Sequence, residues 1–368
     1  MNIVRRHARY FVAALVLLIP IAVLSKSNQR KLVLVDGMDS PVLTIHSPGA
    51  EGNKFGFECG HAVKVNGVYH MFITELYAPP LYVNMRLAHW SSPDRLHWRR
   101  VATLYTSSGD MTGRDPRAVV AGTWLAYDDK EQRWNLFYTA YRATPDLPNR
   151  DGCIWRAFSK AKGIDGIGGP YEDVGIVLRP GPESQVWESV QGTDSFFAYK
   201  VGEKWYSFYG SADYRPAKGD RDPKETIHPD MKGPWSVGLI QSPSLAGPWK
   251  RLPTNPVLIH KRFIECPIVT KLADGTYAAV YDSEIPNSVG YTFSSDGIHW
   301  SPGEPLILQP KGRGHWADAV RTPLGLIPEA NGTFTLLYTG FQHNPSPEAW
   351  AGGDEAVGAA SVKSSSPN

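Results

Sequence analysis

The chain has 368 residues, with 38 Lys and Arg against 36 Asp and Glu, so its formal charge at pH 7 is +2. This near balance excludes the basic surface with which proteins hold a nucleic-acid backbone. The hydrophobic content of 42% is enough for a packed core and excludes a disordered chain. Gly and Pro number 35 and 30, an excess that indicates many turns and therefore many short strands.

The first 30 residues are typical of an export segment. Arg5, Arg6 and Arg9 precede an apolar run over residues 10–24, which is short for a membrane-spanning helix of about 20 residues. The bulky Leu24 is a poor cleavage signal, so a cleaved signal peptide and an N-terminal membrane anchor both remain open. We expect a periplasmic or secreted protein, which contacts the membrane only through the N-terminal segment and only if that segment stays uncleaved.

Residues 31–368 repeat one strand unit five times, namely an apolar strand, a tight polar turn, an aromatic strand and a third strand. Asn66-Gly67 and Asp274-Gly275 are strong hairpin signals, because these residue types accept a positive φ. The expected strands cover residues 58–65, 68–74 and 83–90; 123–127, 134–141 and 153–160; 194–201, 205–210 and 235–242; 265–272, 276–281 and 289–294; and 321–327, 333–340 and 356–363.

Repeated small sheets of this kind predict an all-β fold, a five-bladed β-propeller that forms a single domain over residues 31–368. Each sheet buries its faces against its neighbours, so no unit is expected to fold alone. Closing the ring requires a strand from the far end of the chain. Residues 31–35 or 42–45 are expected to complete the last blade beside residues 356–363.

A narrow ring brings the openings of its five innermost strands face to face, and each opening carries a carboxylate. Strands disfavour acids, and burying several together is costly, so this register indicates a function. The alternative is that each acid bonds turn backbone or pairs with a nearby Arg. The five acids are Glu58, Asp115, Asp194, Glu265 and Asp318.

Facing carboxylates suit hydrolysis of a glycosidic bond, because one protonated acid can donate to the leaving oxygen while an ionised carboxylate activates water or attacks the sugar. Mutual repulsion and partial burial separate their pKa values, so both forms coexist near neutral pH. The other use of such a cluster is to bind a divalent cation. We expect no required cofactor and no metal site, and we leave open a structural Ca²⁺ in the central channel.

The five units, the phrase Ser295-Asp296-Gly297-Ile298-His299-Trp300 and the acids at strand starts resemble the five-bladed propeller glycoside hydrolases, especially family 43. The resemblance runs from about residue 50 to the C-terminus. It implies that Glu265 is the general acid, that Asp194 tunes the pKa of Glu265, and that the reaction inverts the configuration at the anomeric carbon. The matching base is Glu58, where the family has Asp, and Asp115 and His61 are alternative bases.

Two further propeller families share single features with this chain. Arg114-Asp115-Pro116 and Glu265-Cys266-Pro267 resemble the two tripeptides of family 32, although 150 residues separate them and the opening Asn-Asp-Pro phrase of that family is missing. Enzymes of the family 117 type, which act on red-algal galactans, imply a histidine acid, for which His315 is the candidate.

Ten residues near the predicted openings are candidates for contact with substrate. A packed histidine, a tryptophan that covers the core and an arginine that neutralises the acids are the structural alternatives for these residue types. The candidates are His61, Arg114, Asp115, Arg117, Trp187, Gln191, His315, Trp316, Asp318 and Arg321.

Cys59, Cys153 and Cys266 form neither a disulfide framework nor a metal-ligand pattern. Three buried thiols are the simpler expectation, and one bridge is the alternative in an oxidising compartment.

Taken together, the sequence predicts an exported glycoside hydrolase whose partner is a plant or algal poly- or oligosaccharide and which binds no nucleic acid. The alternatives are a non-catalytic glycan-binding propeller and a phosphorylase that uses phosphate in place of water.

Overall fold

The computed structural model describes residues 30–185, 187–188, 190–212, 235–259, 265–283, 285, 287–309, 316–342 and 355–365. Residues 1–29, which carry most of the predicted export segment, lie outside these ranges. Within the ranges, no helix has the length and apolar character needed to cross a bilayer.

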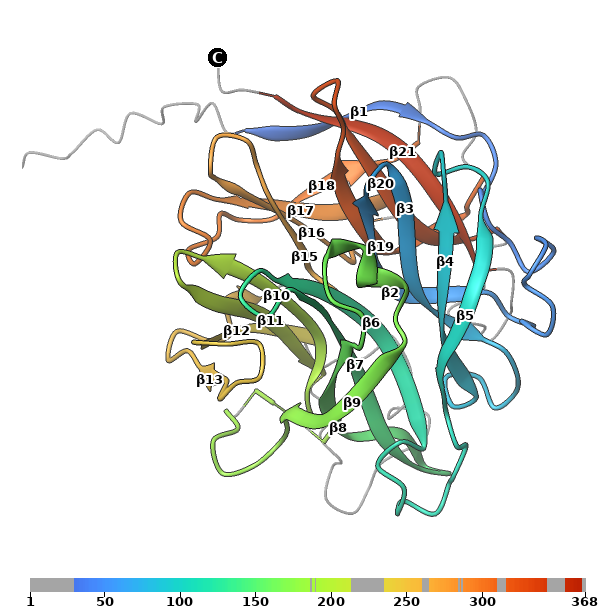
Figure 1. The fold of residues 1–368 in the computed structure, drawn as a ribbon, viewed down its shortest axis with the longest axis vertical. Helices are drawn as coiled ribbons and strands as arrows, with labels where there is room; N and C mark the ends of the chain where they lie inside the picture. The colour runs from blue at the N-terminus through green and yellow to red at the C-terminus, as the bar shows by residue number, and fades with distance from the viewer. Residues whose placement is uncertain are drawn as a thin grey trace, which may run out of the picture.

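Five antiparallel sheets make up the fold, and each is built from strands that are consecutive in the chain, apart from β1 (Figure 1). A short 3₁₀ helix, Ile164–Gly168, precedes β9. Blade 1 contains β2 (Phe57–Val65), β3 (Val68–Leu76), β4 (Met85–Ser92) and β5 (Arg99–Thr106). Blade 2 contains β6 (Val119–Asp128), β7 (Arg133–Thr144), β8 (Leu147–Ser159) and β9 (Tyr171–Leu178).

The other three sheets follow the same order. Blade 3 contains β10 (Asp194–Val201), β11 (Lys204–Ala212), β12 (Trp235–Ser242), β13 (Lys250–Arg251) and β14 (Leu258–Ile259). Blade 4 contains β15 (Ile268–Lys271), β16 (Tyr277–Tyr281), β17 (Ser288–Ser294) and β18 (Glu304–Ile307). Blade 5 contains β19 (Ala319–Pro328), β20 (Phe334–Phe341), β21 (Glu355–Ser365) and β1 (Lys31–Gly37).

The first strand of each blade lines the centre of the molecule. Strand β2 contacts β6, β6 contacts β10, β10 contacts β15, β15 contacts β19, and β19 returns to β2. These contacts close a ring of five, so the all-β five-bladed propeller predicted from the sequence is confirmed. The strand openings of blades that lie far apart in the chain therefore meet at one end of the ring.

The ring is closed by the N-terminal strand. Strand β1 pairs antiparallel with β21, with Lys31 opposite Ser365 and Gly37 opposite Ala360 (Figure 1). Leu43 adds a bridge to Val357 of the same strand. Blade 5 is thus completed by residues from both ends of the described chain, as the sequence predicted, and blades 1 and 5 cannot separate without breaking this pairing.

The hairpin turns explain why the strands within one blade could be predicted from the sequence. Asn66 and Gly67 adopt φ values of 49° and 84°, which the two-residue turn between β2 and β3 requires. The outermost strands β5, β9, β13 and β18 were not predicted, because they are short or half-exposed and lack the apolar run of an inner strand.

The repeated Ser/Asp-rich turns are stabilised by their aspartates. In blade 4, the backbone N–H groups of Ile298 and His299 each donate to Asp296 Oδ1 over 2.8 Å, and His299 Nδ1 contacts Asp296 Oδ2 at 2.7 Å. The aspartate therefore satisfies the turn backbone, while Trp300 packs against the core at Phe208 of blade 3. This phrase is a structural feature of the repeat.

Candidate active site

Three of the predicted acids leave the backbone in the same unusual way. Glu58 lies at the start of β2, Asp194 is the first residue of β10, and Glu265 lies three residues before β15. Each is followed by a non-glycine residue with positive φ: Cys59 at 28°, Ser195 at 55° and Cys266 at 49°. The pairing register shifts just after Glu58 and Asp194, which is typical of β-bulges that redirect side chains.

The fourth blade differs from the prediction at this point. A strand was expected from residue 265, whereas β15 begins at Ile268. Pro267 has no N–H to donate to a ladder, and the positive φ of Cys266 departs from extended geometry. Glu265 is nevertheless tied to the sheet, because its carbonyl accepts the Asp282 N–H over 2.9 Å.

Arg321 of β19 brings the acids of blades 1 and 4 together. Its Nη2 donates to Glu58 Oε1 over 2.8 Å and to Glu265 Oε2 over 3.4 Å. Its Nη1 donates to Asp282 Oδ2 over 2.6 Å. Arg321 was predicted to contact substrate or to neutralise the acids, and in the structure it pairs with two of the predicted acids and with Asp282.

The shared nitrogen limits how far apart the two glutamates lie. With contacts of 2.8 and 3.4 Å to the same Nη2, the two carboxyl oxygens are separated by at most about 6.2 Å. The side chains of Glu58 and Glu265 remain 12% and 13% exposed, whereas that of Asp282 is 4% exposed. Among these three acids, the two glutamates have the greater access to a substrate.

Asp194 joins the cluster from blade 3. Its Oδ1 accepts the Thr139 hydroxyl over 3.0 Å and the Ser195 N–H over 2.6 Å. The side chains of Tyr141 and Glu265 also lie close enough to Asp194 to lower the pKa of its carboxyl group. The structure thus brings together the three residues assigned to catalysis from the sequence, although their chain positions lie in blades 1, 3 and 4.

Burial and neighbouring charge favour a protonated Glu265. Desolvation raises its pKa well above the usual glutamate value; Arg321 opposes this rise, and the charges of Asp194 and Glu58 add to it. Desolvation also raises the pKa of Asp194, although the hydrogen bonds to its carboxyl group oppose the shift. A proton on Glu265 can then be donated toward Asp194 or toward a bound oxygen.

Two buried acids of this region were missed by the sequence reasoning. Asp282 directly follows β16, and Glu355 is the first residue of β21 and is fully buried. Desolvation raises the pKa of Glu355 well above the usual value, the charge of Glu58 adds to it, and Arg321 opposes it. The prediction considered only first strands, whereas β16 ends and β21 begins at the same end of the ring.

His61 and Arg117 lie in packed environments. The buried His61 ring accepts the Leu125 N–H at Nδ1 over 3.1 Å and packs edge-on against Phe197. Burial lowers the pKa of His61 to about 3, so the ring is neutral. Arg117 stacks on Trp155 at 4.0 Å and pairs with Asp173 at 2.6 Å. Both residues were predicted to contact substrate, and in the structure they make these contacts within the protein.

The remaining openings do not present buried acids. Asp115 Oδ1 accepts the Arg117 N–H over 2.8 Å within a turn, and Arg114 is exposed with its carbonyl bonded to Arg142. Asp318 is also exposed. Asp115 and Asp318 therefore differ from the three acids that pair with Arg321, which are Glu58, Glu265 and Asp282. His315, the candidate histidine acid, lies outside the described residues.

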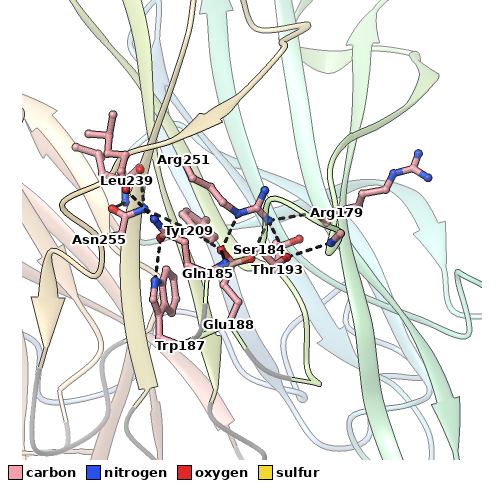
Figure 2. A network of polar contacts seen from close by, with 12 residues as sticks. Arg179, Ser184, Gln185, Trp187, Glu188, Thr193, Tyr209, Leu239, Arg251 and Asn255 are labelled. Carbon is pink, nitrogen blue, oxygen red and sulfur yellow. Dashed lines mark hydrogen bonds and ion pairs between the residues drawn. The ribbon is translucent and has the colours of Figure 1, made fainter.

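The loop that leads into Asp194 is held by a buried ion pair (Figure 2). Arg251 donates to both carboxylate oxygens of Glu188 over 2.6 and 2.7 Å, and the Tyr209 hydroxyl donates to the same carboxylate over 2.8 Å. Trp187 packs against Tyr209, and its Nε1 donates to Gln185 over 3.0 Å. This network holds in place the loop that leads into Asp194.

Gln191 and Trp316 are also engaged. The buried Gln191 accepts the Ala212 N–H at Oε1 over 2.7 Å. Trp316 stacks on Tyr338 with ring centroids 5.9 Å apart, and its Nε1 donates to the Tyr338 hydroxyl over 3.1 Å. Trp187 and Gln191 thus anchor the loop, while Trp316, which is half-buried, keeps an accessible part near the start of β19.

Within the described ranges, no group of three or more His, Cys, Asp or Glu residues has the arrangement needed to hold a metal ion. The positive charge that the structure places among the acids belongs to Arg321, whose guanidinium contacts three carboxylates.

No protein-family model matches this chain, and no curated protein matches it. Solved structures match over most of its length. A family 117 glycoside hydrolase from the marine bacterium Zobellia galactanivorans is 14% identical, with a TM-score of 0.57 over 92% of this chain and 91% of that one. A thermostable family 43 glycoside hydrolase is 14% identical, with a TM-score of 0.54 over 88% and 96%.

The family 32 β-fructofuranosidase of Bombyx mori is 15% identical, with a TM-score of 0.53 over 87% of this chain and 61% of that one. The three families that the sequence resembles are thus the families to which the structure is similar. At these identities the similarity establishes a shared fold, the five-bladed propeller, and the chemistry has to be argued from the residues.

Proposed function

We propose that this protein is a glycoside hydrolase in which Glu265 is the general acid, Asp194 sets the pKa of that acid, and Glu58 is the opposing carboxylate. The observation that carries the proposal is the Arg321 cluster, in which one guanidinium contacts the glutamates of blades 1 and 4, while Asp194 lies close enough to Glu265 for the two groups to shift each other's pKa. The similarity in fold to glycoside hydrolases of three families supports it.

Each carboxyl group has an environment suited to its role. Burial and the charge of Asp194 favour the protonated form of Glu265, which is the form that donates to a leaving oxygen. Glu58 is paired with Arg321 over 2.8 Å, and we assign this carboxylate to activating water or attacking the sugar.

Inversion, which the family 43 resemblance implies, needs carboxyl groups about 6.5–9.5 Å apart so that a water molecule fits. The Glu58 and Glu265 oxygens that share Arg321 Nη2 are at most about 6.2 Å apart, which is shorter than this. The 3.4 Å contact of Arg321 to Glu265 is the longer of the two and the weaker. In the inverting mechanism we propose, entry of substrate and water opens this contact and separates the two glutamates.

The test is Glu265→Gln, assayed with aryl glycosides whose leaving groups differ in acidity. A panel of sugars is needed first to find one that the wild-type protein cleaves. With a poor leaving group such as phenol, the variant is expected to lose about 10²–10⁴-fold in turnover, which is the usual contribution of a general acid. With dinitrophenol, which leaves without a proton, the loss should be much smaller.

The matched control is Glu172→Gln on the exposed strand β9, which should retain wild-type rates with both leaving groups. An equal loss for both leaving groups in the Glu265 variant would contradict the acid role. Binding of oligosaccharide without product from any substrate would support the glycan-binding alternative. Turnover that depends on phosphate would support a phosphorylase, although Arg321 is already occupied by three carboxylates.

The expected substrate is a plant or algal poly- or oligosaccharide, on which the protein acts outside the cytoplasm. Two features support this part of the proposal: the basic and apolar N-terminal sequence, and the similarity in fold to enzymes that include the family 117 hydrolase of a marine bacterium. Released reducing ends from a panel of polysaccharides, and the location of the full-length chain in cell fractions, test the two statements separately.

A further inference from the structure

Two cysteines meet beside the proposed catalytic acids. Cys59 directly follows Glu58 in blade 1, and Cys266 directly follows Glu265 in blade 4. Their sulfur atoms lie 2.6 Å apart, although 207 positions separate the two residues in the chain. Cys266 is 1% exposed and Cys59 is half-buried. The third cysteine, Cys153, lies in β8, where its thiol is 3.3 Å from the Asp151 carbonyl.

We propose that Cys59 and Cys266 form a disulfide that joins blades 1 and 4 and positions Glu58 and Glu265 for catalysis. The inference depends on the proposed function in two respects, because it takes these glutamates as the catalytic pair and assumes an oxidising compartment. The cross-link itself can be measured without any turnover.

The backbone supports a constraint at this point. Cys59 and Cys266 both adopt a positive φ, which is uncommon for residues other than glycine and is most often retained where surrounding structure or function demands it. The equivalent residue of blade 3 is Ser195, whose Oγ accepts the Cys266 N–H over 3.2 Å and lies 3.8 Å from its sulfur. The residues after three acids therefore meet, and two of them are thiols in direct contact.

The two sulfur atoms are in contact inside the ring of blades, so no rearrangement of the backbone is needed to bring them together. A covalent bond between them removes both thiol hydrogens from a buried site.

The bond has to form while the blades are still open. Burial raises the pKa of the Cys59 thiol to about 12 in the folded protein, and a protonated thiol is a poor nucleophile. During folding, one exposed thiolate attacks the disulfide of a dithiol–disulfide oxidoreductase, and the second cysteine then displaces that enzyme from the mixed disulfide. The two cysteines lose two protons and two electrons in total, and the oxidant's disulfide is reduced to two thiols.

The first experiment counts thiols in the exported, full-length protein. The protein is denatured with maleimide in the absence of reductant and its mass is measured. We expect one modified cysteine, Cys153, and none in the matched control Cys153→Ser. A peptide that links residues 59 and 266 should appear in the unreduced digest. Three modified cysteines, or a linked peptide that contains Cys153, would overturn the proposal.

The second experiment tests the positioning role. The double variant Cys59→Ser, Cys266→Ser is expected to lose about tenfold in kcat with little change in KM, because misplacement of catalytic groups by a fraction of an ångström slows the chemical step. Its alkaline pH limit should also move, since the pKa of Glu265 depends on the charge of Glu58. Wild-type kcat and pH profile in the double variant would refute positioning.

The two experiments test the cross-link even if the proposed function is wrong. If no glycoside is cleaved, the thiol count still decides whether the bond exists, and heat denaturation replaces the kinetic comparison. The double variant should then melt about 5 °C or more below Cys153→Ser, because a cross-link that closes a long loop restrains the unfolded chain. Equal melting temperatures together with three free thiols would exclude the cross-link in a catalytically inactive protein as well.

Discussion

Asp194→Asn should lower the pH at which the enzyme loses activity on its alkaline side. Asp194 Oδ1 accepts the Thr139 hydroxyl and the Ser195 N–H, and asparagine retains this oxygen as its amide carbonyl. The substitution therefore removes the negative charge while keeping both of these hydrogen bonds. The charge of Asp194 contributes to the raised pKa of Glu265, so its removal should lower that pKa.

The size of the shift follows from Coulomb's law. The centres of two hydrogen-bonded carboxyl groups are about 5 Å apart, so at an effective dielectric constant of about 20 their charges interact by about 3 kcal/mol. This upper value corresponds to about 2 pH units, since one unit is about 1.4 kcal/mol. Because the interaction is shared with Arg321, Tyr141 and Thr139, we expect a shift of about 1–2 units toward lower pH.

The assay is kcat/KM against pH for any aryl glycoside that the wild-type protein cleaves. The variant should lose about 10–100-fold on the alkaline limb of the profile and much less on its plateau, because Glu265 is protonated in both proteins there. Asp173→Asn is the matched control, since Asp173 lies on β9, the outer strand of blade 2, and pairs there with Arg117. An alkaline limit that stays within about 0.3 pH units of the wild-type value would refute the tuning role.

Three further outcomes follow from the same cluster. Arg321→Met should lower the free energy of unfolding by about 3–5 kcal/mol in urea denaturation, because it leaves buried carboxylates unpaired; Arg321→Lys should lose less, and an unchanged midpoint would contradict the pairing. Burial raises the pKa of Glu355 in the folded protein, so its contribution to stability is fully present below the unfolded pKa near 4.5 and is lost as the pH rises; Glu355→Gln should reduce the fall in unfolding free energy above pH 5 by up to about 1.4 kcal/mol per pH unit, and an equal slope would exclude this. Proton NMR of the first sugar released should show inversion, whereas a retained anomer would make Glu58 a nucleophile.

Much of the fold could be predicted because its signals are local. Asn66-Gly67 accepts the positive φ of a hairpin turn, and the apolar runs on either side pair without help from distant residues. The number of blades then followed from counting units. The pairing of β1 with β21 was also predicted, because a ring of open sheets needs a strand from the far end of the chain.

The candidate site was predictable only in part. Glu58, Asp194 and Glu265 were found because each lies at the opening of a first strand, but the same rule also selected Asp115 and Asp318, which differ in burial. The rule could not find Asp282 or Glu355, since these lie at the end of a second strand and the start of a third. Which strand ends lie together at one end of the ring depends on the pairing register and on β-bulges, and these arise from side chains far apart in the sequence.

The amino-acid sequence alone determined the all-β class, the five units and the set of acids from which the site is built, because turns and alternating apolar runs act over a few residues. The tertiary structure decided which acids gather, that Arg321 holds them, and that Cys59 meets Cys266. Charge balance and sulfur contact depend on distances of a few ångströms between separate blades, and no local pattern in the chain specifies those distances.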